Sequence, residues 1–407
     1  MLFLNRNISK PSLVLFACGL FLTIIGIVLI HSAMFAAPTE YEQNYYKRQA
    51  IWMLMSFILF LIVAFVPMRI YEVFAYVFYV LVILLLIGLL FTGGGKAARW
   101  YKLGFFNLQI SEIAKIAVIF VLARYLSYSR RPANSVLKLA VVVFLVLVPM
   151  LLVLKQPDLG TSLVFIAVLA VVLFWSGIPS TYMLLLMSPV ISLVASSHWI
   201  SWVAFLVVVL VLLQLIKPGA AFSTLTIALN LLSGMIMPFV WNRLQDYQKM
   251  RILVFLDPGR DPLGAGYQII QSKVAIGSGG IWGKGYMAGT QTNLAFIPER
   301  HTDFIFSVLG EELGFWGGFL VLISFLVIIL IGIYTAYKCR NRFSSYVVIG
   351  GVTVIAFQLI VNVGMALGLM PVTGLPLTFI SYGGSSLLAS WFILGLMANA
   401  ELNWQEY

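Results

Sequence analysis

The side chains best suited to chemistry lie in residues 257–304 of a chain that is otherwise largely apolar. This stretch reads DPGRDPLGAGYQIIQSKVAIGSGGIWGKGYMAGTQTNLAFIPERHTDF and combines aspartates, basic residues and a run of glycines. Asp257 and Asp261 each precede a proline, which biases their backbone away from the helical region. A carboxylate held there could be a general base that takes a proton from a substrate hydroxyl. Such aspartates are also common in ordinary turns, so spacing alone does not rank the two.

Basic residues accompany these aspartates, and they have two interpretations. Arg251, Arg260, Lys273, Lys284 and Arg300 surround the two aspartates in the sequence. They could keep a water-exposed loop soluble, or they could stabilise a negatively charged leaving group, as Arg and Lys do for phosphates. A nucleotide is not expected, because Lys284 lacks the flanking residues of a Walker phosphate loop and the dinucleotide pattern fails at Trp282. The glycines instead indicate tight turns or close backbone approach.

A second polar group precedes the fourth apolar run. Glu112 and Lys115 are three positions apart in SEIAK, so on a helix they share a face. Ionisable groups at the edge of a membrane span are costly and usually face a cavity or a partner. The pair is either an ion pair that secures the helix or a lysine that meets a substrate phosphate and is oriented by the glutamate. Arg99 and Trp100 are either an interfacial anchor or part of the same pocket.

Five more carboxylates lie at or near expected helix starts: Asp158 before 159–176, and Glu299, Asp303, Glu311 and Glu312 around the entry to 305–336. Asp158 in KQPDLGTS can cap a helix that has Thr161 in its first turn, and it could also face an outward cavity. Glu311 and Glu312 are adjacent, so on a helix they point about 100° apart and cannot both face one cavity centre. We expect one of them to seat the preceding loop and the other to lie at an interface.

Membrane-spanning helices must position these residues. The chain has 407 residues, is 62% hydrophobic and 10% charged, and has a mean hydropathy of +1.03. Soluble domains are about 45–50% apolar and about 25% charged. Apolar runs of about 20 residues recur, so we predict an all-α polytopic membrane helix bundle of 10–12 transmembrane helices, a single integral-membrane domain over residues 1–407. The expected spans are 12–34, 50–66, 72–92, 110–127, 137–154, 159–176, 180–197, 199–216, 221–240, 305–336, 345–368 and 384–400.

Charge distribution predicts the orientation. Twelve spans put both ends on one side, and the connectors on that side hold most of the short-loop Lys and Arg, which favours a cytoplasmic N-terminus and C-terminus. The segments 93–115, 155–162, 241–304 and 370–386 then share the outer face. The large extracytoplasmic loop 241–304, before the last three spans, adds positive charge that this rule does not explain. Part of the net charge of +11 is therefore expected to serve an anionic substrate.

Cysteine and histidine usage predicts neither a disulfide framework nor a metal site. Cys18 and Cys339 are expected to lie far apart. His31, His198 and His301 are scattered and have no metal-ligand spacing.

Five motifs together resemble those of the SEDS family (shape, elongation, division and sporulation). They are RWYKLG…QISEIAK, QPDLGTS, DPLGAGYQIIQSKVAIGSGG, PERHTDFIFSVLGEELG and PVTGLP…SYGGSS, in the family's order, over residues 99–386. DPLGAGYQIIQSK and ERHTDFIF look closest to the rod-shape branch, RodA, rather than to the division branch, FtsW. The resemblance implies a peptidoglycan glycosyltransferase of the bacterial cytoplasmic (inner) membrane that polymerises lipid II on the outer side for cell elongation and rod shape.

The resemblance also ranks the candidate site residues. It implies that Asp261, in the DPxGxGYQ motif, is the essential catalytic aspartate, and that 241–304 is the catalytic loop. The residues implied to bind substrate are Arg99, Trp100, Glu112, Lys115, Asp158, Arg251, Arg300 and Glu312.

Three features depart from the family pattern. Ile110 and Thr378 replace family prolines. In addition, three apolar runs (180–197, 199–216 and 221–240) stand where the family's ten-span pattern has one. They are either two extra spans or include a run that lies flat or folds back.

The implied mechanism is a hydroxyl attack. Asp261 accepts the proton of the sugar 4-hydroxyl of an incoming lipid II, the hydroxyl attacks the anomeric carbon of the lipid-linked glycan, and undecaprenyl pyrophosphate leaves. Lys115, Arg99 and the loop arginines stabilise its charge. No cofactor is certain, although a divalent cation such as Mg²⁺ could assist. The implied partners are a class B penicillin-binding protein transpeptidase, elongation-complex membrane proteins and membrane lipids, with no nucleic acid.

The alternative function is a lipid II flippase or another transporter. A transporter should need charge pairs near the bilayer midplane, whereas most polar groups here are expected at the outer face. A non-catalytic scaffold is a third hypothesis, against which Asp261 and Lys115 argue. The set of transpeptidase serine motifs does not occur, so cross-linking must come from elsewhere.

Overall fold

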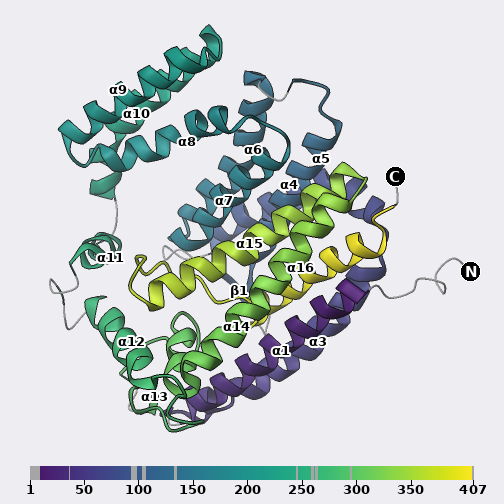
Figure 1. The fold of residues 1–407 in the computed structure, drawn as a ribbon, viewed down its shortest axis with the longest axis vertical. Coiled ribbons are helices and arrows are strands. Elements are labelled where there is room, and N and C mark those ends of the chain that lie inside the picture. The colour runs from purple at the N-terminus through teal and green to yellow at the C-terminus, as the bar shows by residue number, and fades with distance from the viewer. Residues whose placement is uncertain are drawn as a thin grey trace, which may run out of the picture.

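The chain forms a helix bundle in which each expected span is a helix (Figure 1). The computed structural model describes residues 10–35, 37–92, 99–102, 107–132, 135–243, 246–257, 261, 265–293 and 296–405. The long helices are α1 (Lys10–Met34), α3 (Tyr45–Phe65), α4 (Met68–Thr92), α5 (Ile110–Tyr128), α6 (Val136–Leu154), α7 (Leu159–Trp175), α8 (Ser180–Ala195), α9 (Trp199–Ile216), α10 (Ala220–Arg243), α14 (Ile305–Lys338), α15 (Arg342–Ala366) and α16 (Gly384–Leu402). The all-α polytopic fold is confirmed.

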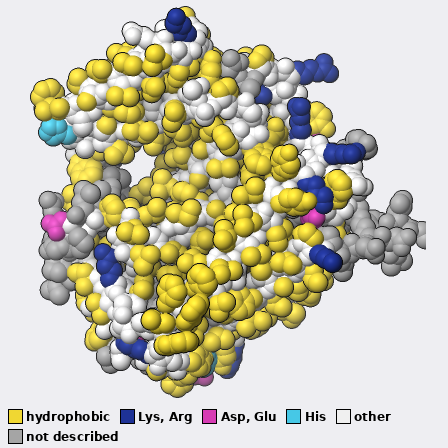
Figure 2. Space-filling model, in the orientation of Figure 1, with side chains coloured by type: hydrophobic (Ala, Val, Ile, Leu, Met, Phe, Trp, Pro, Cys, Tyr) yellow, Lys and Arg dark blue, Asp and Glu magenta, His cyan; other side chains and the backbone are white. Residues whose placement is uncertain are grey.

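Nine helices within the described ranges are long and apolar enough to cross a membrane. In α15 and α16, 78% of the most apolar stretch is buried, against 11% in α9, so α15 and α16 form the centre of the bundle. Figure 2 shows the lipid-compatible exterior, on which hydrophobic side chains dominate and charged ones are few. Helices suit this setting because they satisfy their backbone hydrogen bonds internally.

Close packing at the centre depends on small residues. Gly350 and Gly351 of α15 lie against Ile119 of α5 and Ile393 of α16, with no room for a Cβ atom at either glycine without a shift of the neighbouring isoleucine. Small residues at such positions let membrane helices approach one another closely. Figure 1 shows the start of α1 and the end of α16 on the same side of the bundle.

The three apolar runs at 180–240 form three separate helices that pack mainly on one another, with α8 also against α7. A hydrogen-bonded cluster joins them. Trp202 Nε1 of α9 donates to Ser192 Oγ of α8 (2.9 Å), and Asn230 Nδ2 of α10 donates to Ser188 Oγ of α8 (2.7 Å). Figure 2 shows a hollow between this group and the rest of the bundle.

The polar segment 241–304 is largely helical rather than a simple loop. It contains the end of α10, then α11 (Asp246–Leu256), α12 (Ala265–Gly279) and α13 (Thr290–Asn293). α12 packs against α14. A further short helix, α2 (Glu40–Gln43), precedes α3.

A kink in α14 holds the glycine-rich turn that follows α12. Gly314 has φ 62°, which interrupts the helical hydrogen bonds and leaves carbonyl groups available. The backbone N–H groups of Lys284 and Gly285 donate to the carbonyl oxygens of Glu311 and Glu312, each at 3.0 Å. Gly283 has φ 79°, and a Cβ atom there would collide with the carbonyl of Glu312. The expectation of tight turns and close backbone approach is therefore confirmed.

Candidate active site

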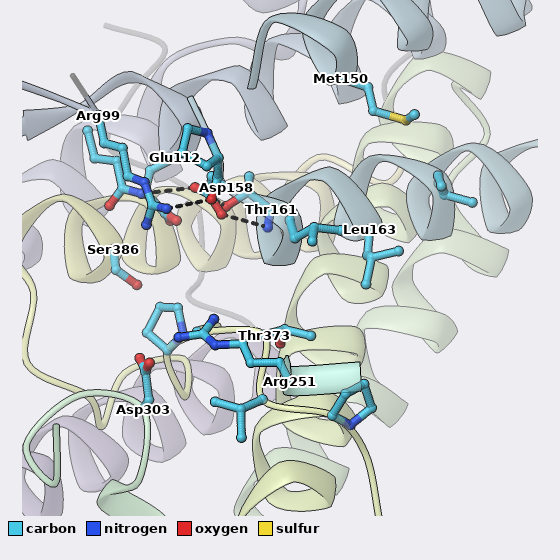
Figure 3. Close-up of a pocket in the computed structure, with 18 of the residues that line it drawn as sticks. Arg99, Glu112, Met150, Asp158, Thr161, Leu163, Arg251, Asp303, Thr373 and Ser386 are labelled. Atoms are coloured by element: carbon cyan, nitrogen blue, oxygen red, sulfur yellow. Dashed lines mark hydrogen bonds between the residues drawn. The ribbon is translucent and has the colours of Figure 1, made fainter. Parts of the chain in front are cut away.

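A cavity of about 1130 Å³ lies where the polar segments meet (Figure 3). Residues from all four of the predicted outer-face segments line it, among them Arg99, Asp158, Arg251 and Thr373. The prediction that these segments come together on one side of the bundle is confirmed.

A β-hairpin builds one polar wall of the cavity. Strands β1 (Trp100–Lys102) and β2 (Asn107–Gln109) pair antiparallel, with Trp100 opposite Gln109, and both of these residues line the cavity. Arg99 Nε donates to the carbonyl oxygen of Gln156 at 2.9 Å, and its guanidinium also donates to that of Pro157. These bonds anchor Arg99 to the turn before α7 while it borders the cavity. The sequence analysis did not predict the hairpin.

Asp158 caps α7, as the sequence predicted, and also lines the cavity. Its carboxylate accepts hydrogen bonds from Thr161 N (3.1 Å) and Thr161 Oγ1 (2.9 Å). Ser111 Oγ (3.3 Å) and Gln109 Nε2 (3.4 Å) donate to the same carboxylate. With four donors around its oxygens, Asp158 is a positioning residue that ties α7 to the start of α5.

Glu112 and Lys115 form a buried ion pair on α5. Lys115 Nζ lies 2.8 Å from Glu112 Oε2, and their side chains are 1% and 3% exposed. Glu112 lines the cavity. The ion pair is present, as both alternatives for these two residues require. Lys115 is not among the described residues that line the cavity, and its contact with a substrate phosphate stays a prediction.

The opposite wall comes from the turn that precedes α14 and from α11. Glu299, Thr302 and Asp303 line the cavity from the turn, and Arg251 lines it from α11. In Figure 3, Arg251 and Asp303 lie across the cavity from Arg99, Glu112 and Asp158. Arg251 is therefore placed where a substrate-binding residue was predicted.

Asp303 is a cavity residue that the sequence analysis did not assign to the site. Burial raises its pKa to about 6, and Glu299 adds to the rise, while Arg251 and Arg99 oppose it. The signal available in the sequence was the PERHTDF motif, in which an aspartate follows a polar turn directly before an apolar helix. That pattern alone does not show that the side chain turns inward.

Two predicted substrate-binding residues face α1 instead of the cavity. Arg300 Nε donates to the carbonyl oxygen of Ala33 at 2.6 Å, and burial lowers the pKa of its guanidinium. Glu312 accepts a hydrogen bond from Ser32 Oγ. Neither is among the described residues that line the cavity, and their contact with substrate stays a prediction. Both residues instead fix α1 against the start of α14.

The adjacent pair Glu311 and Glu312 diverges as helix geometry requires. Glu311 accepts a hydrogen bond from Lys284 Nζ at 2.8 Å and further ones from Thr290, Gln291 and Thr292. Glu311 thus seats the loop, while Glu312 lies at the interface with α1. The basic side chain of the glycine-rich turn, Lys284, therefore has a structural partner.

Asp261 lies in a bend before α12, and its carbonyl oxygen accepts a hydrogen bond from Gly266 N at 3.0 Å. It is not among the described residues that line the cavity. Residues 258–260 and 262–264 on either side, including Arg260, fall outside the described part of the chain. The catalytic role of Asp261 stays a prediction.

The cavity is amphipathic. Away from the charged walls it is lined by apolar side chains of α6, α7 and α8: Met150, Leu163, Ile166, Val190, Leu193 and Val194. At the polar end, Tyr382 lines the cavity and stacks on Tyr45, with ring centroids 4.4 Å apart. Such a cavity suits a ligand with an apolar chain and a polar, charged head.

The described residues do not fit a bound divalent cation. They contain no group of three or more His, Cys, Asp or Glu side chains placed to hold a metal ion. Two of the cavity carboxylates are also engaged, Glu112 with Lys115 and Asp158 with its capping donors. The described residues therefore offer no ligand set for a metal-assisted step of the reaction.

Comparison with known proteins supports one family. The sequence model of the cell cycle protein family FtsW, RodA and SpoVE matches residues 12–206 and 201–406. The chain is 37% identical to the peptidoglycan glycosyltransferase MrdB of Escherichia coli over 90% of this chain and 88% of that protein. It is 34% identical to the peptidoglycan glycosyltransferase RodA of Treponema pallidum, over 96% and 98% of the two chains.

A solved structure shows the same fold. It is described as the structural coordination of polymerization and crosslinking by a peptidoglycan synthase complex. Its matching chain superposes with a TM-score of 0.69 at 31% identity, covering 97% of this chain and 98% of that one.

Proposed function

The chain belongs to the FtsW, RodA and SpoVE family, and from that premise we propose that it is a peptidoglycan glycosyltransferase that polymerises glycan strands for cell elongation. The relatives named MrdB and RodA carry this activity in their names. The observation that carries the proposal is the amphipathic cavity, where Arg99 and Arg251 border a polar end and α6–α8 line an apolar one. A lipid-linked disaccharide diphosphate has the same division between head and tail.

The reaction joins a sugar hydroxyl to an anomeric carbon. The hydroxyl of the acceptor lipid II attacks, the bond from the anomeric carbon to the diphosphate breaks, and its electron pair leaves on undecaprenyl pyrophosphate. Asp261 takes the hydroxyl proton, as its motif implies. Arg99 and Arg251 balance the charge that develops on the leaving diphosphate. Lys115 contributes through Glu112, which it holds in one position.

The partner and the location follow from the same premise. The neighbouring solved complex coordinates polymerization with crosslinking. We propose that this chain pairs with a class B penicillin-binding protein, which supplies the transpeptidation for which the chain has no motif set. The active cavity faces outward across the bacterial cytoplasmic membrane, and both termini are cytoplasmic.

Polymerisation by the purified protein with its transpeptidase partner tests the proposal. Wild type should convert lipid II into glycan polymer, and Asp261→Asn should abolish the product while melting like wild type. Asp257→Asn, in the same loop and also before a proline, is the matched control and should polymerise normally. Full polymer output from Asp261→Asn would remove its assigned role. Transport of lipid II across vesicles without any polymer would favour the flippase.

A further inference from the structure

Asp303 differs from the other carboxylates of the cavity in its surroundings. Glu112 is paired with Lys115, Asp158 accepts its capping bonds, and Glu299 Oε2 accepts a hydrogen bond from Thr302 Oγ1 at 3.2 Å. Within the described ranges, no hydrogen bond reaches either carboxyl oxygen of Asp303. Only its backbone carbonyl is engaged, by Asn362 Nδ2 at 2.9 Å.

The backbone around Asp303 is nevertheless firmly held. Besides the bond from Asn362, Ser381 Oγ donates to the carbonyl oxygen of Thr302, and Tyr382 N donates to that of His301 at 2.9 Å. A turn fixed at three successive carbonyls presents its side chain in one place. A group that is rigidly placed but has no internal partner is what a ligand-binding position requires.

The charges around Asp303 indicate what it would meet. Arg251 and Arg99 are the cations that act on it, and Glu299 and Asp158 are the anions. The same two arginines are the groups proposed above to balance the diphosphate. Arg251 and Asp303 share one wall of the cavity (Figure 3), so an anion bound by Arg251 would lie on the same wall as the Asp303 carboxyl, and an ionised carboxylate there would repel it.

We propose, on the basis of the polymerase function above, that Asp303 in its protonated form donates a hydrogen bond to the diphosphate of the lipid-linked glycan. A carboxylic acid has one O–H donor, whereas a carboxylate only accepts. Desolvation in the cavity already favours the neutral acid, and the negative charge of a bound diphosphate favours it further. Asp303 thereby becomes a third donor to the leaving group beside Arg99 and Arg251.

A protonated Asp303 donor determines whether diphosphate affinity rises or falls with pH. Free protein has Asp303 half-protonated at about pH 6, and the bound diphosphate raises that midpoint. Binding above about pH 6 must therefore take up a proton, and affinity falls by up to tenfold per pH unit until the midpoint of the complex is reached. Asparagine has an uncharged N–H donor at the same position, so Asp303→Asn should remove this dependence.

The first experiment measures binding of geranyl diphosphate, a short lipid diphosphate, to the full-length protein between about pH 5.5 and 8.5 by competition. Wild type should bind more weakly as pH rises, and Asp303→Asn should bind more tightly than wild type at about pH 8. Asp303→Ala should lose affinity at low pH because it has no donor. Glu40→Gln, which removes an exposed acid on α2 outside the cavity, controls for net charge and for titration of the probe itself.

The second experiment measures lipid II polymerisation by the same variants. Asp303→Asn should keep most of the wild-type rate, and Asp303→Ala should lose most of it. If folded Asp303→Asn is as inactive as Asp303→Ala at every pH, the residue acts through its charge and the inference is overturned. If Asp303→Asn does not fold, the wild-type binding profile decides, and a profile identical in slope to that of Glu40→Gln also overturns the inference. A wild type that binds the probe as described yet never polymerises would refute the polymerase alone.

Discussion

Replacing Glu311 should release the glycine-rich turn from α14 without dismantling the bundle. Glu311 is fully buried and accepts hydrogen bonds from Lys284, Thr290, Gln291 and Thr292. In Glu311→Ala the backbone N–H groups of Gln291 and Thr292 lose their acceptor, and each stranded donor costs roughly 1–3 kcal/mol.

The loss of opening free energy in Glu311→Ala comes mainly from the backbone amides of Gln291 and Thr292. A broken buried ion pair can cost about 3–5 kcal/mol, but the Lys284 side chain is 24% exposed and can turn to water. We therefore expect the opening free energy of residues 283–293 to fall by about 3 kcal/mol, equivalent to roughly a hundredfold faster exchange by opening. Glu311→Gln keeps one acceptor oxygen and should lie between Glu311→Ala and wild type.

Hydrogen exchange of the protein in detergent micelles measures the opening free energy of residues 283–293 directly. The informative amides are those of Lys284 and Gly285, because they bond to carbonyl oxygens of α14 and not to the substituted side chain. Glu312→Gln is the matched control, since its partner is Ser32 of α1, and it should leave the turn protected. Unchanged exchange at Lys284 and Gly285 in Glu311→Ala, or equal release by Glu312→Gln, would refute the assignment of Glu311 as the seat of the loop.

Three further predictions follow from single contacts. Lys115→Met strands the buried Glu112 and should lower the free energy of unfolding by about 3–5 kcal/mol, and the double variant with Glu112→Gln should recover much of this in thermal melting. Gly283→Ala forces a side chain into a left-handed backbone against the Glu312 carbonyl and should cost at least roughly 1–3 kcal/mol in the same assay, whereas no loss would contradict the tight turn. Asp303 has a raised pKa, so the folded state binds its proton more tightly and wild-type stability should fall as pH rises from about 4 to 6. Asp303→Asn should therefore melt higher than wild type at neutral pH and lose that advantage below about pH 4.

The sequence predicted the spans and the meeting of polar segments because both depend on strong, simple signals. Apolar runs locate helices regardless of their partners. Consecutive spans then place alternate connectors on one side, and Arg99, Asp158 and Arg251 of such connectors line the same cavity. Asp158 was predicted as a helix cap because that role depends only on the next few residues.

The direction of side chains in turns could not be predicted from the sequence. Arg300 and Asp303 belong to the same short turn, yet Arg300 bonds to α1 and Asp303 lines the cavity. The sequence analysis predicted substrate binding for Arg300 and assigned no role to Asp303. Which way each side chain turns is decided by the contacts of α1, α15 and the 370–386 segment, all distant in the chain. The β1–β2 hairpin was missed for a related reason, since three-residue strands leave no clear alternation.

The charge balance of the cavity links the ion pair to the proposed chemistry. Because Lys115 is matched by Glu112, it adds no net attraction for an anion, and the cations that remain on the cavity walls are Arg99 and Arg251. Asp158, Glu299 and Asp303 share the walls with them, so the described walls carry more negative than positive charge when every carboxyl is ionised. A diphosphate would enter such a site against repulsion. Protonation of Asp303 removes one negative charge where the two arginines act, and it turns a repelling group into a donor. In the proposed polymerase, the buried ion pair on α5 and the acid on the facing turn would serve one arrangement, in which Arg99, Arg251 and protonated Asp303 hold the leaving group.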